Sequence, residues 1–146
     1  MGDVSNIFPG GQLDHIAYAV RSTDAAIRFF SIFYPEIRTY KKLEPEQKVF
    51  ITYLGAPWTD HKIELVEPAE KGNPVENLIE TRESQLYHIC FAVTDFSRDK
   101  ERLQKQGFFL VTEPFASQVT PGFWAAHFFH PHVGLIEITG RKREGQ

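Results

Sequence analysis

Two histidines and two glutamates recur at one spacing in this chain of 146 residues. His15 lies in Leu-Asp-His-Ile-Ala-Tyr-Ala-Val, and His88 lies 73 positions later in Leu-Tyr-His-Ile-Cys-Phe-Ala-Val. The same interval separates Glu64 from Glu137, so each histidine precedes its glutamate by 49 positions. Packing constrains apolar positions and leaves polar ones free, so a repeated His and Glu indicates shared chemistry. We predict that these four residues bind a metal ion.

The predicted ligands narrow the choice of ion. Two buried carboxylates without a partner would cost several kcal/mol, so carboxylates that share a cavity with two imidazoles call for a cation. Imidazole nitrogens and carboxylate oxygens suit one divalent ion of Zn, Mn, Co, Ni or Fe(II), and they leave coordination positions for water or substrate. The alternative is a degenerate repeat that has kept these residues without binding metal.

The remaining histidines and the single cysteine receive other interpretations. His61, His127, His130 and His132 have no counterpart one repeat away, so we interpret them as surface or supporting residues. Cys90 is two positions from His88 and is interpreted as a small core residue.

The composition excludes several classes of protein. The chain is 42% hydrophobic, 14% aromatic and 24% charged, which is typical of a globular domain. A net charge of −3 gives no basic surface for nucleic acid, and the cationic run at 141–143 falls in the predicted tail. There is no secretory signal and no long apolar run, and one cysteine forms no internal disulfide, so we expect a cytoplasmic protein without a membrane segment.

The first half of the chain predicts one module over residues 13–67, after a leader at 1–12. Strand 13–20 alternates, so His15 shares one face with small residues while the opposite face is apolar. Ser22 or Thr23 caps a helix that should cover the apolar face. Its stripe at helical spacing consists of Ala26, Phe29, Phe30 and Phe33. Strands are expected at 37–41, 48–54 and 61–66.

The second half restarts the pattern after a linker at 68–85 that contains a short helix. A strand at 86–93 and a helix at 97–106, stopped by Gly107, precede strands at 108–112, 123–129 and 134–139. This second module spans 86–140, and 141–146 is a tail. Two tandem βαβββ modules predict an α+β protein in which an open mixed β-barrel carries its helices outside.

Strand alternation also predicts which residues line the cavity. The residues beside the two glutamates should face the helices: Ile63, Leu65, Ile136 and Ile138. A predicted hydrophobic, substrate-binding wall is formed by residues on one face of the corresponding strand in each module. These residues are Ile51 and Tyr53 in the first module and Trp124 and Phe128 in the second. Such a wall suits a hydrophobic acyl chain or a flat aromatic ligand. The alternative is that these are core residues beneath a helix.

The marker segments resemble those of the vicinal oxygen chelate superfamily, which includes glyoxalase I, methylmalonyl-CoA epimerase, extradiol dioxygenases and fosfomycin resistance proteins. They are the two His strands, Lys-Ile-Glu-Leu-Val-Glu-Pro at 62–68 and His-Pro-His-Val-Gly-Leu-Ile-Glu-Ile at 130–138. The similarity covers residues 13 to about 140 and most resembles methylmalonyl-CoA epimerase. It implies paired βαβββ modules, a metal held by His15, Glu64, His88 and Glu137, and a homodimer.

The resemblance also implies a reaction. In that superfamily the metal chelates two neighbouring oxygens of a small-molecule substrate and stabilises an enolate or a similar anion. Bacterial epimerases carry a glutamate base on the middle strand of the first module, where this chain has Ile51, with Trp124 as its repeat mate. This chain therefore either uses another base, such as Glu137, Glu46 or Tyr53, or does not act as an epimerase.

Three functions remain open from the sequence. The first is a metal-dependent isomerase or lyase that acts like an epimerase on an acyl-CoA or a related hydrophobic acyl substrate. The second is a glyoxalase I-like lyase or an Fe(II) dioxygenase on another chelating substrate. The third is a binding protein for a hydrophobic drug or metabolite; such members usually lose the metal ligands, which this chain keeps.

Overall fold

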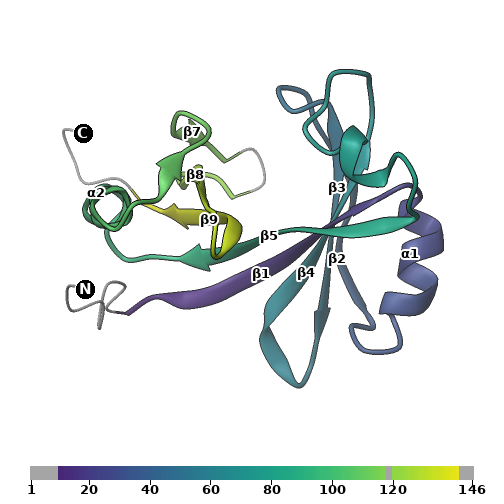
Figure 1. Ribbon diagram of the computed structural model, residues 1–146. Coiled ribbons are helices and arrows are strands. Elements are labelled where there is room, and N and C mark those ends of the chain that lie inside the picture. Colours follow the sequence, from purple (N-terminus) through teal and green to yellow (C-terminus); the bar gives the residue numbers. More distant parts are fainter. Residues whose placement is uncertain (1–9, 118–119, 142–146) are drawn as a thin grey trace. The chain divides into compact units, whose positions relative to one another are not determined.

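The computed structural model describes residues 10–117 and 120–141, and they form two compact units. The N-terminal unit is Asp14–His88, and the C-terminal unit consists of residues 10–13 and the described residues from Ile89 onward. Residues 1–9 of the predicted leader and 142–146 of the predicted tail lie outside the described residues. Figure 1 labels the elements along the chain.

The N-terminal unit is a mixed sheet with one helix. Its elements are β1 (Gln12–Val20), α1 (Thr23–Phe30), β2 (Glu36–Glu44), β3 (Val49–Ala56), β4 (Thr59–Pro68), the 3-10 turn η1 (Glu76–Ile79) and the first part of β5 (Ser84–Ala92). The strand order is β2-β3-β4-β1, with β5 next to β1. β1 and β4 are parallel, whereas β3 is antiparallel to both β2 and β4.

Helix α1 covers the apolar face of this sheet, but with a different stripe from the one predicted. Its N-cap is Ser22, whose hydroxyl accepts the Ala25 N–H at 3.2 Å. The residues of α1 and the following turn that pack on the core include Ala26, Ile27, Phe30 and Tyr34. Phe29 and Phe33 are instead 62% and 63% exposed. The helix ends at Phe30, so Phe33 lies in a turn and cannot continue a helical stripe.

The C-terminal unit contains the rest of β5 and a second helix. Its further elements are α2 (Phe96–Lys105), β6 (Phe109–Leu110), β7 (Phe115–Ala116), β8 (Trp124–His130) and β9 (Gly134–Gly140). The strand order is β5-β9-β8-β6, and β7 also pairs with β8. The Asp95 carboxylate caps α2 by accepting the Arg98 N–H at 3.0 Å. Gly107 follows α2 with a φ of 90°, as expected for a glycine stop.

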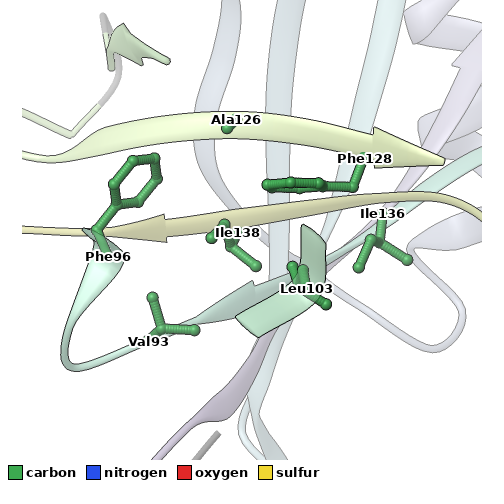
Figure 2. Close-up of a cluster of buried hydrophobic side chains, with 7 residues drawn as sticks. All are labelled: Val93, Phe96, Leu103, Ala126, Phe128, Ile136 and Ile138. Atoms are coloured by element: carbon green, nitrogen blue, oxygen red, sulfur yellow. The ribbon is translucent and has the colours of Figure 1, made fainter. Parts of the chain in front are cut away.

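The predicted helix-facing isoleucines and leucine are confirmed in both units. Ile63 and Leu65 belong to the core beneath α1. Ile136 and Ile138 belong to the core beneath α2, which Phe96 and Leu103 close from the helix side (Figure 2). Glu64 and Glu137 therefore lie on the sheet faces away from the helices.

Strand registers in the two units repeat at 73 positions, with one exception. Ala17 pairs with Glu64 where β1 meets β4, and Cys90 pairs with Glu137 where β5 meets β9. Opposite these glutamates, however, β3 supplies Tyr53 and β8 supplies His127, which are 74 positions apart. Because a slip of one residue turns every side chain of a strand to the other face, β8 presents a different face from the one predicted.

The α+β class and the mixed sheet are confirmed. Strand pairing ends at β2 in the N-terminal unit and at β6 and β7 in the C-terminal unit, so the sheet is not closed among the described residues. The barrel and the tandem modules remain predictions. No helix in the described part of the chain is long and apolar enough to cross a membrane.

Candidate metal centre

Three of the four predicted ligands meet inside the N-terminal unit. The Nε2 atoms of His15 on β1 and His88 on β5 lie 3.2 Å apart. The Glu64 Oε1 atom on β4 lies 3.6 Å from each of them. All three residues are buried, with 3%, 3% and 6% of their surfaces exposed. Residues far apart in the sequence thus direct two imidazole nitrogens and a carboxylate oxygen at one point.

The spacing of these three atoms fits a single metal ion. Ligands about 2.1 Å from one ion are separated by roughly 3.0 Å in octahedral and 3.4 Å in tetrahedral geometry. The separations of 3.2, 3.6 and 3.6 Å are close to this range. Two nitrogens and one oxygen are also the donors that borderline divalent ions prefer. The residues present therefore fit a divalent cation.

Asp14 prepares His15 for this role. Its Oδ2 atom lies 2.7 Å from His15 Nδ1, so that nitrogen carries the hydrogen and Nε2 keeps a lone pair for a metal. Burial raises the pKa of Asp14, but the hydrogen bond with His15 and the nearby charges of His15 and Lys62 outweigh it and bring the pKa below its ordinary value. The carboxylate therefore stays ionised. Adjacent residues in a strand do not normally share a face, and the sequence analysis assigned Asp14 no role.

Tyr53 holds the carboxylate of Glu64. Its hydroxyl donates to Glu64 Oε2 at 2.7 Å, while Oε1 of the same carboxylate lies near the two histidines. The cross-strand register explains this contact, because Tyr53 and Glu64 are directly opposite on β3 and β4. Tyr53 was predicted as part of a substrate-binding wall and as a candidate base. The structure gives it a further contact, which fixes Glu64 by a hydrogen bond.

Glu137, the fourth predicted ligand, lies in the C-terminal unit on β9. It is 9% exposed, and its Oε2 atom lies 3.5 Å from His127 Nε2 on β8. His127 is itself 4% exposed, so it is not a surface residue. The repeat interval of 73 compares His127 with Leu54, so it gives this histidine no polar counterpart. The interval of 74 on this strand would have paired His127 with Tyr53.

The predicted hydrophobic wall divides between two faces. Phe128 is fully buried in the core under α2 (Figure 2). Trp124 packs against the same core. This packing favours the alternative that they are core residues beneath a helix, because the one-residue shift on β8 turns them toward α2. Ile51 is 7% exposed, and its register counterpart on β8 is Ala125 rather than Trp124.

Glu46 lies in the exposed turn between β2 and β3. Tyr53 lies opposite Glu64 and is four residues along β3 from Val49, the first residue of the strand after this turn. At the rise of a strand this is roughly 13 Å. The position of Glu46 therefore gives no support to its predicted role in proton transfer.

Comparison with known proteins decides the family. A model of the glyoxalase/bleomycin resistance protein/dioxygenase superfamily matches residues 14–125. The chain belongs to this superfamily. This confirms the resemblance to the vicinal oxygen chelate proteins found in the sequence.

Several relatives of this superfamily member are epimerases. Over 99 residues it is 30% identical to the ethylmalonyl-CoA/methylmalonyl-CoA epimerase of Cereibacter sphaeroides. The matched stretch covers 66% of this chain and 72% of the relative. Methylmalonyl-CoA epimerase from Mycobacterium tuberculosis has the same fold, with a TM-score of 0.78 at 20% identity over 98% of this chain and 95% of that one. A hypothetical protein from Bacillus halodurans, BH1468, gives a TM-score of 0.75 at 26% identity over 93% and 98% of the two chains.

Proposed function

We propose that this protein is a metal-dependent isomerase or lyase that acts like an epimerase on an acyl-CoA or a related acyl substrate. The observation that carries the proposal is the convergence of His15 Nε2, His88 Nε2 and Glu64 Oε1 within 3.6 Å of one another. The 30% identity to an epimerase of ethylmalonyl-CoA and methylmalonyl-CoA supports the substrate class.

In this proposal Glu137 completes the set of ligands. It occupies the same register position on β9 as Glu64 does on β4, each opposite a residue of the parallel strand that carries a histidine ligand. This shared register also supports two tandem βαβββ modules. The homodimer and the cytoplasmic location remain predictions from the sequence.

In this proposal the residues around the site have separate roles. When bound, a divalent cation supplies Lewis-acid stabilisation for the negative charge that develops on a substrate oxygen. Asp14 keeps the Nδ1 hydrogen on His15, and Tyr53 keeps Glu64 turned toward the histidines. The carbon next to the thioester must lose and regain a proton, and we assign that transfer to Glu137.

The test combines metal content with solvent exchange. The purified protein should contain about one equivalent of divalent metal, and His88→Ala should lose it. His132→Ala removes an exposed histidine at the turn between β8 and β9 and should keep the wild-type content. Wild-type protein should then exchange the α-proton of methylmalonyl-CoA with deuterated solvent, and His88→Ala should not.

The outcomes separate the three functions that the sequence leaves open. Metal with α-proton exchange supports the proposal. Metal without exchange on a panel of acyl-CoAs contradicts the epimerase-like activity and leaves a different chelating substrate. Absence of metal in the wild type, even after reconstitution with Zn, Co, Mn, Ni or Fe(II), contradicts the metal site and leaves a binding protein.

A further inference from the structure

His127 is the only histidine of the C-terminal unit's described residues that is fully enclosed, and it lies against a predicted metal ligand. Its Nε2 atom is 3.5 Å from Glu137 Oε2, and the two side chains are 5% and 12% exposed. The contact follows from the register, because His127 and Glu137 are directly opposite on β8 and β9. The pairing is therefore built into the sheet.

Two further residues hold the imidazole of His127 in place. Thr112 Oγ1 lies 3.3 Å from Nδ1, and Phe115 stacks on the ring with centroids 5.8 Å apart and planes 28° apart. Both residues precede β8 in the chain. A ring restrained at its edge and on its face presents Nε2 in one direction, which is toward Glu137.

The Thr112 hydroxyl also indicates which ring nitrogen carries the hydrogen. It accepts the backbone N–H of His127 at 3.1 Å, which occupies one of its lone pairs. The hydroxyl hydrogen can then be donated to Nδ1, an arrangement that places the ring hydrogen on Nε2. In that tautomer Nε2 lies 3.5 Å from Glu137 Oε2, which is an ion-pair contact and longer than a hydrogen bond.

The same place in the N-terminal unit is occupied by a different donor. There Tyr53 donates its hydroxyl to Glu64 Oε2 at 2.7 Å. The two units thus place unlike side chains opposite their glutamates, a phenol in one and an imidazole in the other, although the strand register around each glutamate is the same. A structural duplication alone would not require a hydrogen-bond donor at both places.

We infer that His127 is a positioning residue for Glu137, whose Nε2 restrains one carboxylate oxygen through the 3.5 Å contact and leaves the other for the cation, in the place that Tyr53 takes beside Glu64. This role rests on the proposed function, because Glu137 acts there as a metal ligand. Replacing a residue that orients a metal ligand generally lowers the metal affinity about 10- to 100-fold. His127 therefore contributes to metal affinity without itself touching the metal.

The experiment compares two variants that differ in one property. His127→Phe keeps a flat ring against Phe115 and removes the donor, whereas His127→Gln keeps an N–H at the same reach. We expect His127→Phe to weaken Co(II) binding about 10- to 100-fold in calorimetric titration and to shift the visible Co(II) spectrum. His127→Gln should restore both, and His132→Phe, at an exposed position, should resemble the wild type.

The outcomes distinguish this inference from the proposed function. If the wild type binds Co(II) and His127→Phe binds it with the same affinity and spectrum, His127 has no positioning role and the metal site stands. If the wild type binds no Co(II), both are wrong. Should His127→Phe not fold, Thr112→Val provides the second test: it removes the hydroxyl that fixes the tautomer, and it should weaken Co(II) binding several-fold. Unchanged binding in that variant would also overturn the role.

Discussion

Replacing Phe128 by alanine should remove one of the two largest fully buried side chains of the described residues. The ring lies in the core under α2 among Leu103, Ile136 and Ile138 (Figure 2). A buried aromatic side chain removes at least about 150 Å² from water, which at about 25 cal/mol per Å² is worth roughly 4 kcal/mol. This agrees with the 3–5 kcal/mol that Phe-to-Ala changes typically cost in cores. We therefore expect the free energy of unfolding to fall by about 4 kcal/mol.

Urea unfolding followed by tryptophan fluorescence measures this change. Phe109→Ala is the matched control, because Phe109 is 66% exposed and should lose only about a third as much, or roughly 1 kcal/mol. The slope of the unfolding free energy against urea concentration should be similar in both variants, since neither substitution greatly changes the surface that unfolding exposes. If Phe128→Ala costs no more than Phe109→Ala, Phe128 does not lie in the core, and the one-residue shift on β8 is wrong.

Two further predictions concern stability. Burial raises the pKa of Glu44 above its ordinary value of 4.5, so ionisation in the folded state is disfavoured and stability is lost as pH rises through that raised pKa. Glu44→Gln should therefore raise the melting temperature at pH 7, and the gain should vanish below pH 4.5; an equal gain at both pH values would refute this cause. Gly140→Ala would place a Cβ atom 2.6 Å from the Val93 carbonyl oxygen and should destabilise by about 1–3 kcal/mol in thermal unfolding. Gly55→Ala meets only the movable end of Arg38 and should cost less; equal losses would contradict this reasoning.

The candidate metal site could be predicted from the sequence as far as the repeat is regular. The strands that carry the histidines and glutamates keep an interval of 73, so a search at that interval finds His15, Glu64 and His88. The structure brings these three together. Strand alternation was also sufficient to assign Ile63 and Ile138 to the helix-covered faces. In both cases the predicted property follows from a period that the sequence itself displays.

The supporting residues could not be found in this way because they depend on contacts that no period records. The bond from His15 Nδ1 to Asp14 joins neighbours that an ideal strand would turn to opposite faces. Helix α1 ends at Phe30, so Phe33 lies in an exposed turn. Phe29 lies within the helix but is exposed, because Ile27 and Phe30 take the side that packs on the core. Local backbone geometry, rather than residue type, decides each of these cases.

The single extra residue before β8 had the largest consequence for the interpretation of function. Counting at 73 positions compares Tyr53 with Ala126 and suggests that only one glutamate has a polar neighbour. The register compares Tyr53 with His127 and gives both glutamates a polar neighbour on the adjacent strand. An alignment error of one residue therefore exchanges a core position for a site position, since neighbouring residues of a strand face opposite sides. A polar residue that lies one position from the place expected in a repeated strand can therefore belong to the site. Its cross-strand partner shows whether it does.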